Sequence, residues 1–145
     1  MKAILCHHHG TPDDLRLDEV PQPHAGTGEV VVKIAAAALN FFDTLIIANK
    51  YQIKPAFPFS PAAEFAGIVH EIGAGVSGWK VGDRVMSYSA YGAAREYLVI
   101  KASRLVRIPD SLDFDRAAGL SVTYGTTIHA LKDRAQMKPD ATLAV

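Results

Sequence analysis

The stretch FAGIVHEIGAGVSGWKVGDRV, residues 65–85, decides how this chain folds. Its middle, from Gly73 to Gly78, has the G-x-G-x-x-G spacing of a dinucleotide-binding loop. Such a loop follows a strand and opens a helix, because the pyrophosphate rests on the N–H groups of the first helical turn. Residues 65–72 fit a strand, but Gly78 and the pair Gly82-Asp83 interrupt any helix after the glycines. We therefore expect a turn between two strands here, with no cofactor bound to it.

Short β-prone segments surround this turn as far as residue 108. In residues 29–39 apolar side chains alternate, so that Val30, Val32 and Ile34 share one face of the expected strand. Short strands at such spacing predict a closed or partly closed barrel. Strands are expected at residues 2–6, 14–18, 29–39, 65–72, 84–87, 95–100 and 105–108.

Helical signals dominate after Pro109. Asp113 is a good N-cap for a helix that begins at Phe114, and residues 122–134 have helical spacing. An earlier helix is expected at residues 42–49. The apolar residues 141–145 predict a buried parallel strand with no partner after it, so we expect the chain to be part of a longer protein.

Composition limits the classes of function. The 145 residues are 49% hydrophobic, enough for a packed core, and carry 15 basic and 15 acidic side chains. A net charge of zero, without a basic run or a long apolar segment, argues against partners such as nucleic acid or a membrane. The single cysteine, Cys6, excludes an internal disulfide, and a cytoplasmic location is expected.

Several motifs occur together in a recognisable order. They are GEVVVKI (28–34), NFFDT (40–44), PFSP (58–61), EFAGIV (64–69), GAGV (73–76), VGDRV (81–85), EY (96–97) and PD (109–110). This series resembles the N-terminal GroES-like catalytic domain of the medium-chain dehydrogenase/reductase superfamily, in its zinc-free quinone oxidoreductase branch. The resemblance implies a mainly β fold with helices, in which a partly closed GroES-like β-barrel is followed by helices that lead to a missing Rossmann domain.

The resemblance also implies a domain division and an activity. Residues 1–110 would form the catalytic barrel, 111–140 a helical connection, and 141–145 the start of the first strand of a nucleotide-binding domain. The complete protein would be a homodimeric, NADPH-dependent oxidoreductase that transfers hydride to quinones or enones, whereas the 145-residue chain alone is expected to be inactive. The alternatives are a non-catalytic GroES-like binding or assembly module and a relative of the zinc-type alcohol dehydrogenases.

Three residues are the site candidates. Asn40 ends an apolar strand; it is either a helix cap or a cleft residue that contacts the cofactor's ribose or the substrate carbonyl. Tyr51, the only catalytic candidate, would stack on a flat substrate and donate to its carbonyl oxygen, or is an ordinary loop tyrosine. Thr127 matches a threonine that contacts the nicotinamide in the family, or bonds to its own helix backbone. For Glu64 we expect a basic partner beneath the cleft, with a role in acid–base chemistry as the alternative.

No metal site is expected. The zinc ligands of the superfamily would stand where this chain has Asn40 and Ala63, and neither residue is a normal zinc ligand. The histidine run 7–9 is interpreted as a polar strand end, because alternate strand residues point to opposite faces.

Overall fold

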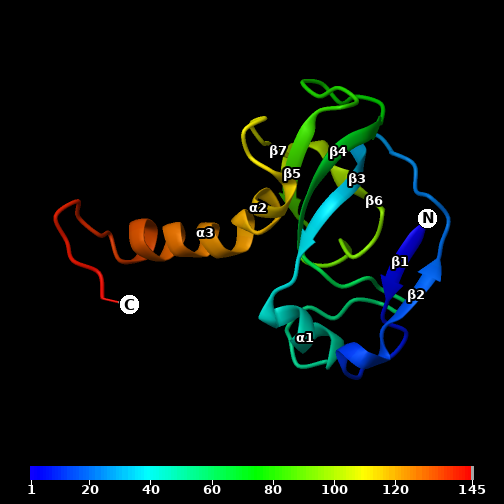
Figure 1. Ribbon diagram of the computed structural model, residues 1–145, viewed down its shortest axis with the longest axis horizontal. Coiled ribbons are helices and arrows are strands. Elements are labelled where there is room, and N and C mark those ends of the chain that lie inside the picture. The colour runs from blue at the N-terminus through cyan, green and yellow to red at the C-terminus, as the bar shows by residue number, and fades with distance from the viewer. Residues whose placement is uncertain (145) are drawn as a thin grey trace.

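The computed structural model describes residues 1–144, which form two β-sheets and a set of helices (Figure 1). Strands β1 and β2 pair antiparallel as a two-stranded sheet. The larger sheet has the order β6-β3-β4-β5-β7, and every neighbouring pair in it is antiparallel. The strands are β1 (Lys2–Leu5), β2 (Arg16–Glu19), β3 (Glu29–Ala38), β4 (Glu64–Ile72), β5 (Arg84–Tyr88), β6 (Tyr97–Lys101) and β7 (Val106–Arg107).

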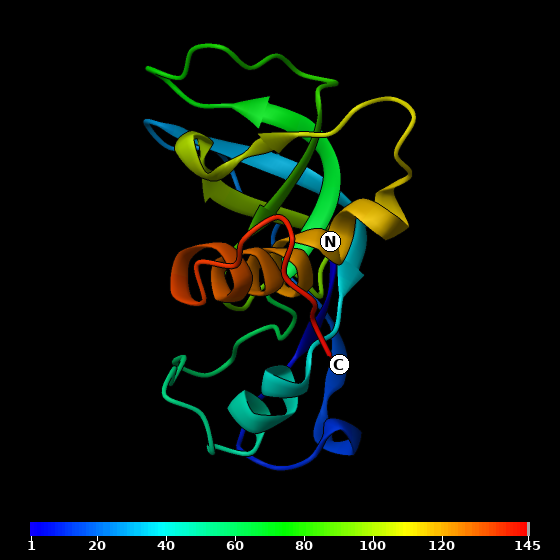
Figure 2. The same cartoon turned by 90° about the vertical axis from the view of Figure 1, so that its left-hand side faces the viewer.

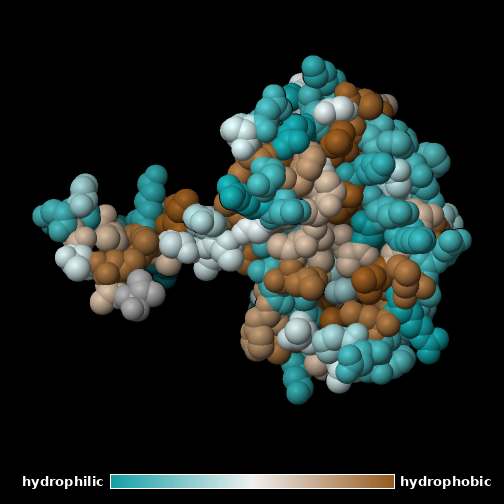
Figure 3. Space-filling view, viewed as in Figure 1, coloured by the Kyte–Doolittle hydropathy of each residue, from teal (hydrophilic) through white to brown (hydrophobic). Residues whose placement is uncertain are grey.

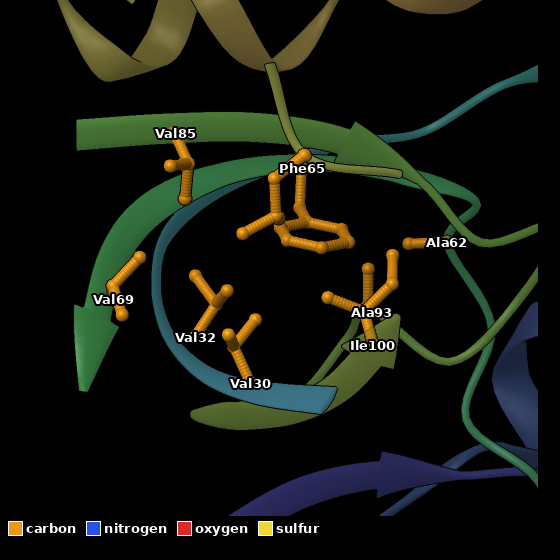
Figure 4. Packing of buried hydrophobic residues seen from close by; sticks show 9 residues of the cluster. Val30, Val32, Ala62, Phe65, Val69, Val85, Ala93 and Ile100 are labelled. Atoms are coloured by element: carbon orange, nitrogen blue, oxygen red, sulfur yellow. The ribbon is translucent and has the colours of Figure 1, made fainter. Parts of the chain in front are cut away.

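The five-stranded sheet curves around the main core without closing. Figure 4 shows apolar side chains from the curved strands converging on the space that the sheet encloses. Val30, Val32 and Phe65 are fully buried there, and Ile34 packs against them, as the alternation predicted. The edge strands β6 and β7 do not pair with each other in residues 1–144. The prediction of a mainly β fold with a partly closed barrel is therefore confirmed.

The glycine-rich stretch 73–78 is a turn between strands. It connects β4 to β5, which pair antiparallel, and no helix lies between them. The N–H of Gly73 donates to the carbonyl of Glu29 at 2.9 Å, which holds the turn against the start of β3. Gly75 and Gly78 adopt positive φ angles of 75° and 79°, which glycine tolerates best. The interpretation of this motif as a barrel turn is confirmed.

The helices begin and end close to the predicted positions. The helices are α1 (Phe41–Ile47), α2 (Phe114–Ala118), α3 (Leu120–Ile128), a π-helical continuation (His129–Arg134) and 3₁₀ turns at Pro12–Asp14 and Ala102–Arg104. The strand expected from residue 14 begins at Arg16 instead, because Pro12–Asp14 form a 3₁₀ turn. The helix expected at 122–134 begins at Leu120 and changes its winding after Ile128.

The C-terminal helix extends away from the sheets as an arm (Figure 1). Tyr124, Ile128 and Leu143 on this arm expose more than half of their surface, and Figure 3 shows apolar residues along it. The strand expected at 141–145 is not seen over 141–144, where no neighbouring strand is present to pair with it, and Val145 lies outside the described residues. The division into domains stays a prediction. Within residues 1–144 no helix is both long and apolar enough to cross a membrane.

Candidate functional site

An open cleft of about 440 Å³ lies between α1, the end of β5 and α3. Figure 2, which looks along α3, shows this helix passing between α1 and the large sheet. The lining residues come from four separate parts of the chain. They are Phe42, Tyr51, Tyr88, Ser121, Val122, Gly125, Thr126 and His129.

One wall of the cleft is aromatic. The rings of Phe42 and Tyr51 stack with their centroids 5.5 Å apart and their planes 23° apart. Tyr88 adds a third ring from the end of β5. Burial raises the pKa of the Tyr88 phenol, and the nearby Tyr51 acts in the same direction. Tyr88 therefore stays protonated at neutral pH and is available as a hydrogen-bond donor.

Residues of α3 and of its continuation form the opposite wall. Ser121 and Thr126 bring hydroxyl groups to it, and His129 brings an imidazole. His129 Nδ1 lies 2.9 Å from Asp133 Oδ2, which leaves the other ring nitrogen free of that contact. An aromatic wall that faces hydroxyl and imidazole groups suits a flat ligand with polar atoms at its rim.

A network of buried polar groups lies behind the cleft. Asn40 is the N-cap of α1, and its backbone N–H donates to Asp43 Oδ2 at 2.7 Å. Its side-chain Nδ2 donates to Glu64 Oε1 at 3.1 Å. Glu64 Oε2 accepts the backbone N–H of Val122 at 2.8 Å. Asp43 and Glu64 expose only 3% and 1% of their surface, so these bonds form away from water.

The three predicted site residues occupy different places. Tyr51 lines the cleft, as proposed for a substrate contact. Asn40 is half-buried at the start of α1 and is not among the lining residues. Two hydrogen bonds, both to Glu64, connect it to Val122. Thr127 Oγ1 donates to the carbonyl of Thr123 at 2.8 Å on the exposed part of α3, as in its structural interpretation. The structure thus brings Tyr51 to the cleft and leaves Thr127 outside its lining.

Glu64 differs from expectation. The sequence predicts a basic partner for it, but within residues 1–144 Glu64 forms no ion pair. Its two oxygens instead accept N–H groups from Asn40 and Val122. The expectation is wrong because the positive end of α3 takes the place of a cation.

Sequence reasoning missed Tyr88, Phe42 and Ser121 as lining residues. Tyr88 lies directly opposite Glu64 in the β4–β5 ladder. This register places Tyr88 beside the residue that binds the start of α3. Pairing residues 84–88 against 64–68 in the sequence would have been the signal for it.

Two side chains of the histidine run contact other groups. His7 Nε2 lies 2.6 Å from Asp18 Oδ2, and His9 packs edge-on against Phe57. In residues 1–144 no group of three or more His, Cys, Asp and Glu side chains is close enough together to hold a metal ion. That the protein binds no zinc stays a prediction.

The buried carboxyl of Asp43 makes stability depend on pH. Burial raises its pKa above the ordinary value, and the nearby charge of Glu64 adds to this, while the backbone amides of Asn40 and Ala62 act in the opposite direction. The folded chain therefore holds the Asp43 proton more tightly than the unfolded chain does. This group contributes stability that is fully present below the unfolded pKa of about 3.9 and is lost as pH rises through the folded value.

We expect the stability of Asp43→Asn relative to the wild type to be highest at pH 7, because the amide oxygen still accepts the Asn40 N–H and no buried charge remains. This relative stability should decrease as pH falls towards 4, since the wild-type carboxyl becomes protonated. Urea unfolding at pH 7, 6, 5 and 4, followed by the fluorescence of Trp79, measures both chains. A difference in unfolding free energy that stays constant over this range would contradict the assignment.

The curved antiparallel sheet, the glycine turn and the cleft beside α3 define a class of protein. The alcohol dehydrogenase GroES-like domain family matches residues 26–110, and the chain belongs to this family. Among its relatives, quinone oxidoreductase-like protein 2 of Rattus norvegicus is 38% identical over 144 residues, which are 99% of this chain and 41% of the relative. Quinone oxidoreductase of Rattus norvegicus is 33% identical, over all of this chain and 45% of the relative.

Solved structures agree with this assignment. The human synaptic vesicle membrane protein VAT-1 homolog-like protein superposes with a TM-score of 0.92 at 30% identity, over 95% of this chain and 45% of that chain. Mycobacterial Rv1454c, solved in complex with NADPH, superposes with a TM-score of 0.81 at 35% identity, over 92% of this chain and 41% of that one. The chain thus spans less than half the length of these relatives.

Proposed function

We propose that this chain is the substrate-side part of an NADPH-dependent, zinc-free oxidoreductase that transfers hydride to quinones or enones. The observation that carries the proposal is the aromatic cleft, where the stacked rings of Phe42 and Tyr51 face the polar side chains of α3. A quinone is flat and apolar over its ring, with carbonyl oxygens at the rim, and so matches both walls. The quinone oxidoreductases among the relatives support this class of substrate.

The residues of this chain fit one end of NADPH and not the other. The cleft offers aromatic and hydroxyl groups for a ring such as the nicotinamide. The pyrophosphate has no helix N-terminus to bind in residues 1–144, because Asp43, Asp113 and Glu64 already occupy those of α1, α2 and α3. When bound by the whole protein, the cofactor would supply the hydride.

Within this proposal the chain's own residues bind and orient the substrate. The Tyr51 hydroxyl donates a hydrogen bond to a carbonyl oxygen, and Tyr88 is a second donor at the same cleft. Phe42 stacks on the ring and excludes water from it. Asn40 and Thr127 are proposed for the cofactor, and each requires a ligand that extends beyond the described cleft. The homodimer and the cytoplasmic location stay predictions.

Variants of Tyr51 test the proposal on the chain itself. We expect Tyr51→Ala to weaken the binding of menadione, a flat naphthoquinone, by about tenfold because a stacking ring is lost. Tyr51→Phe keeps the ring and loses only the hydroxyl, so we expect a loss of about threefold. Isothermal calorimetry gives the dissociation constants.

Tyr124→Ala is the matched control, because Tyr124 is 63% exposed on α3 and does not line the cleft. Its dissociation constant for menadione should equal that of the wild type. No measurable binding by the wild-type chain, or equal losses in the Tyr51 and Tyr124 variants, would contradict a quinone site in this cleft.

A further inference from the structure

A single buried carboxylate connects the two helices that form the cleft. Glu64 lies on β4, and its partners Asn40 and Val122 are 24 and 58 residues away in the sequence. Asn40 is the N-cap of α1, and Val122 is the third residue of α3. Both helices contribute lining residues to the cleft, Phe42 from α1 and Val122 itself from α3. Glu64 therefore contacts the N-terminal end of each of these two helices.

Helix α3 depends on this contact because it has no cap of its own. Its N-cap residue is Gly119, which has no side chain to accept the free N–H groups of the first turn. Glu64 accepts one of them at 2.8 Å from a neighbouring strand. A carboxylate at this position is also favoured by the helix dipole. Removing it would leave the base of the arm without its polar anchor on β4.

The contact also fixes the orientation of Asn40. Both oxygens of Glu64 accept hydrogen bonds, one from Asn40 and one from Val122. The side of the Asn40 amide that faces Glu64 is therefore the NH₂ group. In this pair Asn40 is the donor and Glu64 is the acceptor. Exchanging these two roles therefore tests whether ligand binding depends on the hydrogen bond or only on the volume of the two side chains.

We propose that Glu64 is a positioning residue, which holds α1 and α3 at the separation that a flat quinone requires and orients the Asn40 amide behind the cleft. The link to a quinone rests on the proposed function. The hydrogen-bonded pair with Asn40 and the cap on α3 do not, since they are contacts of the chain alone.

Exchanging the two side chains gives the test. In Asn40→Asp, a half-buried carboxylate faces the buried carboxylate of Glu64, and we expect menadione to bind about tenfold more weakly. In the double variant N40D/E64Q, the new amide at position 64 donates to the new carboxylate at position 40, while the amide oxygen accepts the Val122 N–H. The double variant has the same formal charge and the same number of hydrogen bonds as the wild type. We expect its dissociation constant to return to within about threefold of the wild-type value.

Glu64→Gln is the second single variant of this double-mutant cycle. We expect its loss of menadione affinity to be smaller than that of Asn40→Asp, because Asn40 can turn its amide over and present its oxygen to the new NH₂ group. Asp113→Asn is the control. It alters a capping carboxylate of α2 outside the cleft and should leave menadione binding unchanged. If the losses of the two single variants simply add in the double variant, Glu64 only fills space and the proposal is overturned. If Asn40→Asp does not fold, recovery of both folding and binding in the double variant still decides.

Hydrogen exchange of the Val122 amide separates this proposal from the proposed function. We expect slow exchange in the wild type and in the double variant, and exchange at least about tenfold faster in Glu64→Ala, because only the last lacks an acceptor. If the wild type binds no menadione but the exchange pattern holds, the quinone function fails and the anchoring role of Glu64 stands. Equal exchange rates in all three chains would overturn the anchoring role whatever the ligand.

Discussion

The Gly73→Ala chain should fail to reach the native fold. A Cβ atom added at Gly73 would lie 1.8 Å from the carbonyl oxygen of Gly26 and 2.9 Å from that of Glu29. Both neighbours are backbone atoms, and the carbonyl of Glu29 accepts the Gly73 N–H. Neither can move without breaking the contact between the turn and the start of β3. We expect a loss of more than about 4 kcal/mol, a large part of the stability of a domain this size.

Gly78→Ala in the same motif is the matched control. Nothing lies within 4 Å of a Cβ atom at Gly78, so the only cost is its φ of 79°, about 1 kcal/mol. Circular dichroism and urea unfolding, followed by the fluorescence of Trp79, measure both variants. A Gly73→Ala chain with the unfolding midpoint of the Gly78→Ala chain would show that the motif is needed for its turn conformation and not for close backbone approach.

This contrast explains how much of the fold the sequence could predict. The alternation of Val30, Val32 and Ile34 set the face of β3, and the absence of a helix after Gly78 made the motif a turn. Both are local patterns. The approach of Gly73 to Gly26 is not, because it joins two loops 47 positions apart in the chain. Local patterns in the sequence predicted that the glycines form a turn. They did not predict that Gly73 has to be glycine because the backbone of Gly26 lies so close to it.

The site was less accessible to sequence reasoning. Tyr51, between a helix and a proline-rich loop, is a candidate mainly through the family resemblance, and it lines the cleft. Tyr88 and Glu64 were missed in their present roles because each depends on strand register, which pairs them across β4 and β5. The partner of Glu64 is a backbone N–H of α3, a group present in nearly every residue that leaves no mark in the sequence. Side-chain chemistry alone therefore suggested a basic partner that the fold does not supply.

The second large effect concerns the cofactor: we expect the 145-residue chain to bind NADPH more weakly than about 1 mM, which corresponds to about −4 kcal/mol. Anionic ligands favour free N–H groups at helix N-termini. In residues 1–144 a carboxylate already lies at the N-terminus of each α-helix: Asp43 at α1, Asp113 at α2 and Glu64, from β4, at α3. A pyrophosphate would meet like charge at all three.

The contacts that remain do not offset this deficit. Hydrogen bonds from Asn40, Tyr51 and Thr127 would contribute about 1 kcal/mol each, whereas association costs about 4–15 kcal/mol before any affinity appears. In the presence of menadione, NADPH should therefore be oxidised no faster with the chain than in buffer alone. The chain should still bind menadione in the aromatic cleft. Calorimetric titration with NADPH measures the affinity, with mycobacterial Rv1454c, solved in complex with NADPH, as the positive control. Micromolar binding by this chain would show that a phosphate site exists within it, and that a carboxylate in the first turn of a helix does not exclude the cofactor.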